Sequence, residues 1–329
     1  MTDPITRAAR LSVAPMMDWT DRNCRRFHRL MSRHALLYTE MVTAPAILHG
    51  DRARLLDHDA AEQPLALQLG GSDPDELRAA TRIAADWGYA EINLNCGCPS
   101  DRVQSGAFGA VLMTMPERVA DCVSAMQAVS PVEVTVKCRI GVDDQDPETA
   151  LPAFLTAMQG AGIRRLTIHA RKAWLKGLSP RENRQIPPLD YPLVRRMKAQ
   201  FPNLHLSING GIASLDEVRA HLQVMDGVMV GRAAYHEPWT ILGDADRLWD
   251  ATPPFEDPAQ VAAAMRPLIL DHLAEGGRLH QMTRHMLGLF HGRPGARMWK
   301  RTLSEGASKG GIEVYDAALA QVTEAHAPA

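Results

Sequence analysis

The sequence has few aromatic residues, few cysteines and no long apolar segment. Aromatic residues make up 5% of the 329 residues, and the five cysteines, at positions 24, 96, 98, 122 and 138, form no disulfide-like set. Such thiols are typical of a reducing compartment, so we expect a cytoplasmic protein. Cys96 and Cys98 have no second cysteine pair, and we expect no metal site. Because no apolar run could span a bilayer and residues 1–10 lack a signal-peptide core, no membrane association is expected.

The chain also lacks a large net charge. The 36 Lys and Arg residues and 38 Asp and Glu residues leave a formal charge of −2. A nucleic-acid partner would therefore have to be bound by a local basic patch. The length allows one α/β domain of roughly 200–250 residues and a smaller second one.

Short β-like runs alternate with helical patterns through the first 240 residues. The predicted strands are 11–16, 36–40, 65–69, 91–94, 132–137, 165–169, 204–209 and 227–230. The predicted helices between them are 22–31, 74–87, 116–129, 148–159, 191–200 and 214–223. This alternation predicts an α/β fold, a (β/α)₈ TIM barrel. An open doubly wound sheet is the alternative, but no G-x-G-x-x-G follows the first strand.

The region after residue 250 has a different pattern. A proline-rich segment, 251–258, precedes helical runs without strand alternation, so we expect a catalytic barrel over 1–250 and a small all-helical domain over 251–329. Residues 278–301 contain six Lys or Arg, three His and no Asp or Glu. A one-sign patch of this kind favours a polyanionic partner, although a solvated helix face would look the same.

Polar residues follow the predicted strands, which is where a TIM barrel places its active site. The fourth strand ends in Asn93-Leu94-Asn95-Cys96-Gly97-Cys98. A thiol there could donate a proton or act as a nucleophile, and the sequence leaves the choice between Cys96 and Cys98 open.

Two glycine-containing segments, Asn209-Gly210-Gly211 and Gly231-Arg232, follow the seventh and eighth strands. Barrels commonly bind phosphate there, and sugar phosphate, PLP and FMN all remain possible ligands. Lys137 is expected to point into the barrel mouth, where it could form a Schiff base, bind phosphate or lie beside a flavin. Gln68 offers a donor and an acceptor, and the role of His169 stays open.

These motifs, together with Ala14-Pro15-Met16 upstream, resemble the tRNA-dihydrouridine synthase family, and the segment 172–188 resembles its A subfamily. The resemblance covers nearly the whole chain. It implies an FMN enzyme that uses NADPH to reduce the C5=C6 bond of uridines 20 and 20a in the D-loop of tRNA, without an obligate protein partner.

By the same resemblance, Cys98 would donate a proton to C5. The residues implied to hold FMN are Pro15, Met16, Met17, Gln68, Lys137, His169, Asn209, Gly210, Gly211, Gly231 and Arg232. The residues implied to contact tRNA are Asn95, Arg181, Arg184, Arg297 and Lys300.

Two other functions compete with this hypothesis. A flavin dehydrogenase for free pyrimidines or dihydroorotate shares the barrel, FMN and a loop cysteine or serine, but needs no basic helical domain. A catalytically silent RNA-binding barrel would need neither Cys98 nor Lys137. A row of arginines at 22, 26, 29 and 33 could contact RNA or form a solvated helix face.

Overall fold

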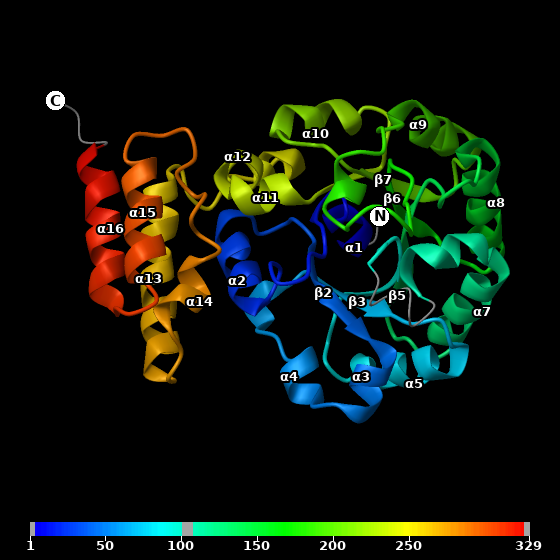
Figure 1. Ribbon diagram of the computed structural model, residues 1–329, viewed down its shortest axis with the longest axis horizontal. Helices are drawn as coiled ribbons and strands as arrows, with labels where there is room; N and C mark the ends of the chain where they lie inside the picture. Colours follow the sequence, from blue (N-terminus) through cyan, green and yellow to red (C-terminus); the bar gives the residue numbers. More distant parts are fainter. Residues whose placement is uncertain (1–3, 101–107, 326–329) are drawn as a thin grey trace.

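The computed structural model describes residues 4–100 and 108–325, and these residues form a parallel β-barrel and a group of helices (Figure 1). The strands are β1 Leu11–Val13, β2 Leu37–Thr43, β3 Leu65–Gly70, β4 Glu91–Cys96, β5 Glu133–Arg139, β6 Arg165–His169, β7 His205–Asn209 and β8 Gly227–Val230. Their order in the sheet is β1-β8-β7-β6-β5-β4-β3-β2, and a parallel bridge between Ser12 and Leu36 joins its two edges. The predicted TIM barrel is confirmed.

The helices between the strands surround the barrel. They are α1 Pro4–Ala8, α2 Arg22–Met31, α3 Ala44–His49, α4 Arg52–Leu56, α5 Pro74–Ala85, α7 Pro116–Gln127, α8 Pro147–Gly160, α9 Tyr191–Gln200, α10 Leu215–His221, α11 Arg232–His236 and α12 Pro238–Leu242. Short 3₁₀ turns occupy η1 Ala60–Glu62, η2 Gly109–Thr114, η3 Glu182–Arg184 and η4 Ala245–Trp249.

Local sequence signals explain where several helices begin. The Asp73 carboxylate accepts hydrogen bonds from the backbone N–H groups of Asp75 and Glu76, and Pro74 occupies the first turn of α5. Ser214 caps α10 in the same way. These side chains satisfy donors that have no partner within the helix, and α5 begins at residue 74, where the sequence predicted it.

The barrel separates an apolar outer layer from a largely polar interior. Successive side chains of a strand point to opposite faces, so on β4 Ile92, Leu94 and Cys96 pack with the helices. Glu91, Asn93 and Asn95 alternate with them. A second, smaller apolar cluster contains Ile5 and Ala8 of α1 together with Ala14, Leu36, Tyr38, Ala66 and Met229. The barrel interior therefore contains an apolar part and a polar part.

Several strands are longer at their carboxyl ends than predicted. β4 continues through Asn95 and Cys96, and β5 continues beyond Lys137 to Arg139, because Asn95 pairs with Lys137 and Arg139 with His169. Polar side chains led us to expect loops at these positions. The parallel ladder bonds the backbone and tolerates polar side chains that point inward. β1 is shorter than predicted, since the chain leaves the sheet before Pro15, which has no N–H to donate.

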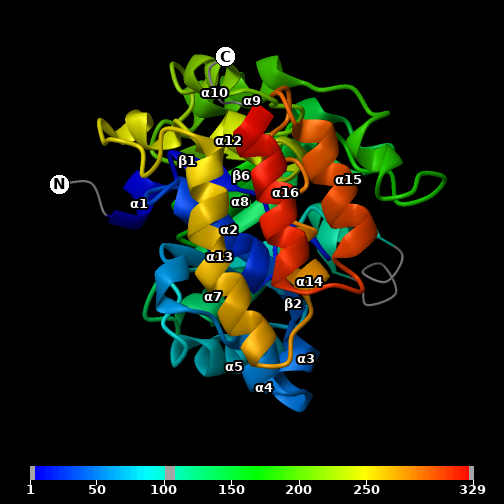
Figure 2. The same cartoon turned by 90° about the vertical axis from the view of Figure 1, so that its left-hand side faces the viewer.

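The C-terminal helices pack as a separate group beside α2, α11 and α12 (Figures 1 and 2). They are α13 Pro258–Ala274, α14 Leu279–Thr283, α15 Ala296–Gly306 and α16 Ile312–Ala325. Phe290, Trp299 and Tyr315 form its aromatic centre, with ring centroids 4.9 and 5.6 Å apart. The Tyr315 hydroxyl donates to the Ala262 carbonyl, which ties α16 to α13. The region after residue 250 is therefore all-helical, and its independence as a domain stays a prediction.

An ion-pair cluster connects α2 with the helical group. Asp21, which caps α2, accepts hydrogen bonds from the Arg284 guanidinium at 2.6 Å and lies 3.0 Å from His285. Burial alone would raise the pKa of Asp21, but hydrogen bonds from His285, Cys24 and Arg284 lower it to about 2.

The arginine row on α2 has structural partners. Arg22 pairs with Asp57 at 2.9 Å and Arg26 with Asp59 at 3.5 Å. Arg29 donates to the backbone carbonyls of Ser32, Ala35, Glu62 and Pro64. The structure thus favours a fold-stabilising role over RNA contact for Arg22, Arg26 and Arg29, whereas Arg33, just after α2, is exposed.

In the described part of the chain, no helix is both long enough and apolar enough to cross a membrane.

Candidate active site

Three amide side chains are linked inside the barrel mouth. The Gln68 amide nitrogen donates to Asn93 Oδ1 at 2.8 Å, and Asn95 Nδ2 donates to Gln68 Oε1 at 2.8 Å. Asn95 Oδ1 accepts the backbone N–H groups of Gly97 and Cys98, both at 3.0 Å. Asn95 is buried and holds the turn that presents Cys98, so it has a structural role. Its contact with tRNA stays a prediction.

The structure separates the two cysteines that the sequence left open. Cys96 is fully buried between the strands and the outer helices, and burial raises the pKa of its thiol well above the usual value. Cys98 is partly exposed at the mouth, where its sulfur lies 3.4 Å from the Ser100 hydroxyl. Only Cys98 is therefore placed to meet a ligand.

Arg139 fixes the loops around Cys98. Its guanidinium is buried and donates to the carbonyls of Gly97, Lys172 and Asn183 at 3.0–3.1 Å. The Asn183 side chain in turn accepts the Trp174 N–H at 2.7 Å and donates to the carbonyls of Trp174, Leu178 and Ser179. Sequence reasoning gave neither residue a role. The sequence features that could have indicated a role are the position of Arg139 at a strand end and that of Asn183 in a glycine-containing loop.

A cluster of cations lies beside Cys98. Lys137 and His169 point into the mouth from β5 and β6, and Arg139, Arg171 and Arg184 approach them. Burial, reinforced by Arg139, lowers the pKa of Lys137 to about 8. Burial and the same neighbouring cations lower the pKa of His169 well below its usual value, so that its imidazole is neutral at pH 7.

No carboxylate balances this cluster among residues 4–100 and 108–325. The side chains of Lys137 and His169 form no hydrogen bond with the described residues, and the buried Nε of Arg171 has no acceptor there. Positive charges that lie close together without a carboxylate repel one another, and a bound anion would relieve this repulsion.

Two glycine loops close the other side of the mouth. Gly210 and Gly211 have φ values of 114° and 76°, and a Cβ on Gly210 would lie 2.6 Å from the His169 ring. Only glycine fits there without displacing His169. The Tyr191 hydroxyl donates to the Gly210 carbonyl at 2.5 Å, and Asn209 Nδ2 donates to the Met229 carbonyl. The backbone N–H groups of Gly210 and Gly211 find no acceptor in the described part of the chain.

Arg232 is the first residue of α11, directly after Gly231, and it links the loop after β8 to the segment that contains Arg184. Its guanidinium donates to the Arg184 carbonyl at 3.1 Å, and the two charges lie close enough to lower the pKa of Arg184 further than burial alone does. Arg184 is therefore part of the barrel mouth. Both Arg184 and Arg181, one turn earlier, are exposed.

The loop after β1 lies at the edge of the mouth. Pro15 and Met16 are half-buried, and Met17 is 56% exposed. Thr20 Oγ1 accepts the Met16 N–H at 3.0 Å and so closes the turn. Trp19 in this loop stacks on Tyr235 of α11 with ring centroids 4.4 Å apart.

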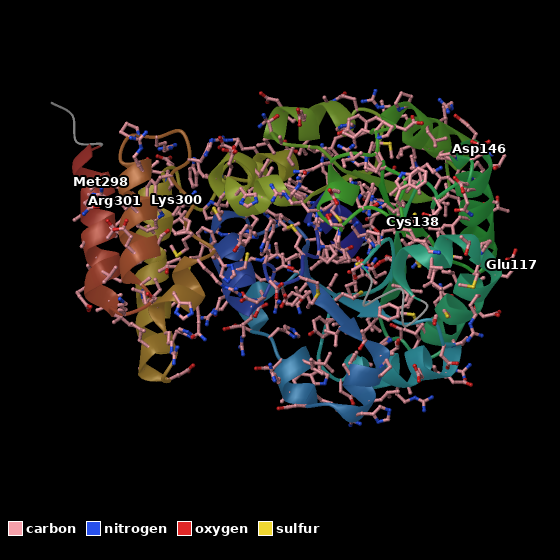
Figure 3. The ribbon with its side chains drawn as sticks, in the orientation of Figure 1. Glu117, Cys138, Asp146, Met298, Lys300 and Arg301 are labelled. Atoms are coloured by element: carbon pink, nitrogen blue, oxygen red, sulfur yellow. The ribbon has the colours of Figure 1, made fainter. Side chains whose placement is uncertain are left out.

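The predicted basic segment 278–301 is only partly available for a partner. Arg284 and His285 pair with Asp21, and Arg293 pairs with Asp257 at 2.9 Å. Arg297, Lys300 and Arg301 on α15 are exposed, and the described residues offer them no carboxylate within 4 Å. Figure 3 shows Lys300 and Arg301 in the helical group, away from Cys138 of β5 in the barrel. The Lys300 charge nevertheless reaches His236 of α11, whose pKa is lowered by burial and then by Arg232.

The described residues contain no cluster of three or more His, Cys, Asp or Glu side chains suited to a metal ion.

Comparison with known proteins identifies the family. A family model described as dihydrouridine synthase (Dus) matches residues 12–325, which is most of the chain. The chain belongs to the dihydrouridine synthase family. This confirms the resemblance that the motifs at Cys98, Asn209 and Arg232 indicated.

Relatives of this dihydrouridine synthase family member match over nearly their whole length. The tRNA-dihydrouridine(20/20a) synthase of Vibrio vulnificus (strain CMCP6) is 52% identical over 323 residues, which cover 97% of this chain and 99% of the relative. The protein of the same name from Escherichia coli (strain K12) is 56% identical over 309 residues, 93% of this chain and 89% of the relative.

Solved structures with a similar fold are more distant. Morphinone reductase has a TM-score of 0.53 at 15% identity and covers 77% of this chain and 88% of its own. An old yellow enzyme homologue from Zymomonas mobilis has a TM-score of 0.50 at 12% identity, over 77% and 91% of the two chains. At this identity the likeness supports the barrel fold alone.

Proposed function

We propose that this protein is an FMN-dependent, NADPH-driven tRNA-dihydrouridine synthase that reduces uridines 20 and 20a of the D-loop. The observation that carries the proposal is a cluster of Lys137, His169 and arginines beside the half-buried Cys98, with no carboxylate paired to it among the described residues. Relatives named tRNA-dihydrouridine(20/20a) synthase, 52–56% identical over nearly the full chain, support the substrate.

The residues present fit FMN. Unpartnered N–H groups at Gly210 and Gly211, together with the Arg232 guanidinium, suit a phosphate. The half-buried Lys137, whose side chain has no hydrogen-bond partner in the described chain, suits a ring edge that becomes negative on reduction. Pro15, Met16 and Met17 would cover the ring, Asn209 and Gly231 would shape the loop, and the neutral His169 would contact the phosphate end.

When bound, FMN reduced by NADPH would supply the hydride for C6 of the uracil ring. The protein's own residues orient the reactants. Gln68 would donate an N–H to a ring carbonyl, and Lys137 would favour the anionic form of the cofactor by its charge. Arg139 and Asn183 keep the Cys98 loop in place through bonds to backbone carbonyls.

Cys98 would provide the proton for C5. Its thiol stands at the mouth on a turn fixed by Asn95 and lies beside the cluster of Lys137 and Arg139. Cys96, buried and facing the helices, cannot replace it.

The tRNA would contact both parts of the molecule. Extruding a uridine from folded tRNA costs a few kcal/mol of lost stacking, which phosphate contacts can offset. Arg181 and Arg184 lie beside the mouth, and Arg297 and Lys300 lie on α15. We therefore assign residues 1–250 to FMN and catalysis and residues 251–329 to tRNA binding.

The test is to incubate the protein with FMN, NADPH and an unmodified tRNA transcript and to map dihydrouridine by mass spectrometry. We expect dihydrouridine at positions 20 and 20a, and none in a transcript with cytidine at both. Comparable turnover of free uracil or dihydroorotate would instead indicate a small-molecule flavin dehydrogenase. Binding of tRNA without any dihydrouridine would indicate a silent RNA-binding barrel.

A further inference from the structure

A continuous line of hydrogen bonds runs from the floor of the barrel to the Cys98 turn. It starts at Glu91, the first residue of β4, whose Oε1 accepts the Thr135 hydroxyl at 2.5 Å. The Thr135 oxygen accepts Asn93 Nδ2 at 2.8 Å. Asn93, Gln68 and Asn95 continue the line to the backbone N–H groups of Gly97 and Cys98. Every side chain in it is at most 9% exposed.

The two ends of this line determine its direction independently. An ionised carboxylate can only accept, so the Thr135 hydroxyl must donate to Glu91, and its oxygen is left to accept from Asn93. A backbone N–H can only donate, so Asn95 must turn its oxygen towards Gly97 and Cys98. If any one amide between these ends were flipped, two donors or two acceptors would face each other at about 2.8 Å. Such a contact is costly in a buried site.

Glu91, at the start of the line, is itself held in place. Glu91 is fully buried and forms an ion pair with Arg165, which also contacts Glu133 Oε2 at 2.6 Å. The Tyr38 hydroxyl donates to Glu91 Oε1 at 2.6 Å. With an arginine on one oxygen and two hydroxyls on the other, the carboxylate is held in one orientation.

We propose that Glu91 is a positioning residue that, through Thr135 and Asn93, makes the amides of Gln68 and Asn95 present only N–H donors to the bound rings. Both amide oxygens point along the line, where Gln68 Oε1 accepts from Asn95 and Asn95 Oδ1 accepts from Gly97 and Cys98, and each NH₂ group keeps one N–H that the line does not use. The mouth would therefore select ring edges that carry carbonyl oxygens, as flavin and uracil do. The ligand part of this inference depends on the proposed function, whereas the direction of the line does not.

The test compares three threonine variants. Thr135→Val has the shape of threonine but lacks the hydroxyl, Thr135→Ser restores it, and Thr167→Val is the matched control. Thr167 is also buried, and together with Glu91 and Thr135 it lines a small cavity at the barrel floor. Its hydroxyl has no partner among the described residues.

Ligand-free protein gives the first readout. In Thr135→Val, we expect shifted and faster-exchanging side-chain amide NMR signals for Asn93, Gln68 and Asn95, and an altered alkylation rate of Cys98. Thr135→Ser and Thr167→Val should resemble the wild type. Unchanged amide signals and Cys98 reactivity in Thr135→Val would overturn the proposal, whatever reaction the enzyme catalyses.

Loaded enzyme gives the second readout. Thr135→Val should weaken FMN binding roughly threefold to tenfold, because one donor loses its fixed direction. It should lower kcat by on the order of 10-fold to 100-fold through a misplaced Cys98 turn, and leave the KM for tRNA nearly unchanged. An effect on KM alone would contradict a positioning role.

Neutron diffraction of the wild-type protein tests the direction without a variant, should Thr135→Val fail to fold. Deuterium on Gln68 facing Asn93, and on Asn95 facing Gln68, is expected. The opposite orientation of either amide would disprove the inference. If wild-type protein forms no dihydrouridine but shows this orientation, the proposed function fails and the direction of the line stands.

Discussion

At the scale of single residues, the barrel mouth is defined by positive charges that have no carboxylate partner among the described residues. A neighbouring carboxylate would offset the effect of burial on the pKa of Lys137, but the charges of Arg139 and Arg184 lower that pKa further. The protein therefore tolerates a strained electrostatic arrangement that a bound anion relieves, which is typical of functional sites.

This arrangement predicts that the affinity for FMN depends on pH. Lys137 has a lowered pKa of about 8, so in the ligand-free protein it is charged below pH 8 and loses its proton above it. Because an anionic cofactor favours the charged form, the affinity should fall as the pH rises from 7 to 9, by up to about tenfold per unit above the pKa. Fluorescence titration of FMN into ligand-free protein measures it. Lys137→Arg keeps the charge and should flatten the profile, and a flat wild-type profile would contradict this role of Lys137.

Cys98 and Cys96 offer a matched pair for the proton donor. Cys98→Ala should retain bound FMN and tRNA affinity but lose most of its turnover, on the order of 10²–10⁴-fold, because only the proton source is removed. Cys96→Ala removes a buried thiol that faces the helices and should keep kcat at a modest cost in stability. Dihydrouridine formation at the wild-type rate by Cys98→Ala would exclude this thiol from the mechanism.

At the scale of elements, the start of α2 depends on one carboxylate shared with the helical group. Asp21 has a pKa of about 2, below its usual 3.8, so it stabilises the fold fully above pH 3.8 and loses this contribution as the pH falls through 2. The shift corresponds to about 2 kcal/mol. Asp21→Asn should lower the free energy of unfolding by about that amount at pH 7, and by less at pH 3, in urea titrations.

The control for Asp21 is Asp57→Asn. Asp57 pairs with Arg22 of α2, the helix that Asp21 caps, but both side chains are about half exposed. Asp57→Asn should therefore have little effect on the free energy of unfolding. Equal destabilisation by the two variants at pH 7 would contradict a special role for the buried cluster.

The sequence predicted elements better than it predicted their ends or their partners. Strand and helix periodicity gave the barrel, and Asp73-Pro74 gave the start of α5, because both signals are local. The extension of β5 to Arg139 depends on ladder pairing with β6, which no local pattern contains. For the same reason the basic segment 278–301 looked like one surface, whereas Asp21 and Asp257, distant in sequence, neutralise part of it.

At the scale of the whole molecule, two basic regions lie on different parts of the chain. The first surrounds the mouth at Arg184 and Arg232, and the second is on α15 (Figure 3). His236, which senses the charges of both Arg232 and Lys300, lies between them. A substrate that touches both must be larger than a free base, which agrees with tRNA.

The double variant Arg297→Ala/Lys300→Ala tests the second region. It should weaken tRNA binding and lower the slope of log K against log salt by roughly one unit per lost phosphate contact. Filter binding at several salt concentrations measures the slope. Arg82→Ala, an exposed residue on α5, is the control and should leave it unchanged. An unaltered slope in the double variant would place the RNA surface elsewhere.

The most direct test of the account is an anaerobic single turnover. The FMN-loaded protein is reduced with NADPH, freed of excess reductant and mixed with unmodified tRNA, while flavin absorbance and dihydrouridine are followed together. We predict that flavin reoxidation and dihydrouridine formation occur at the same rate and in equal amounts. A flavin that stays reduced in the presence of tRNA, or a protein that binds no flavin at all, would contradict the account.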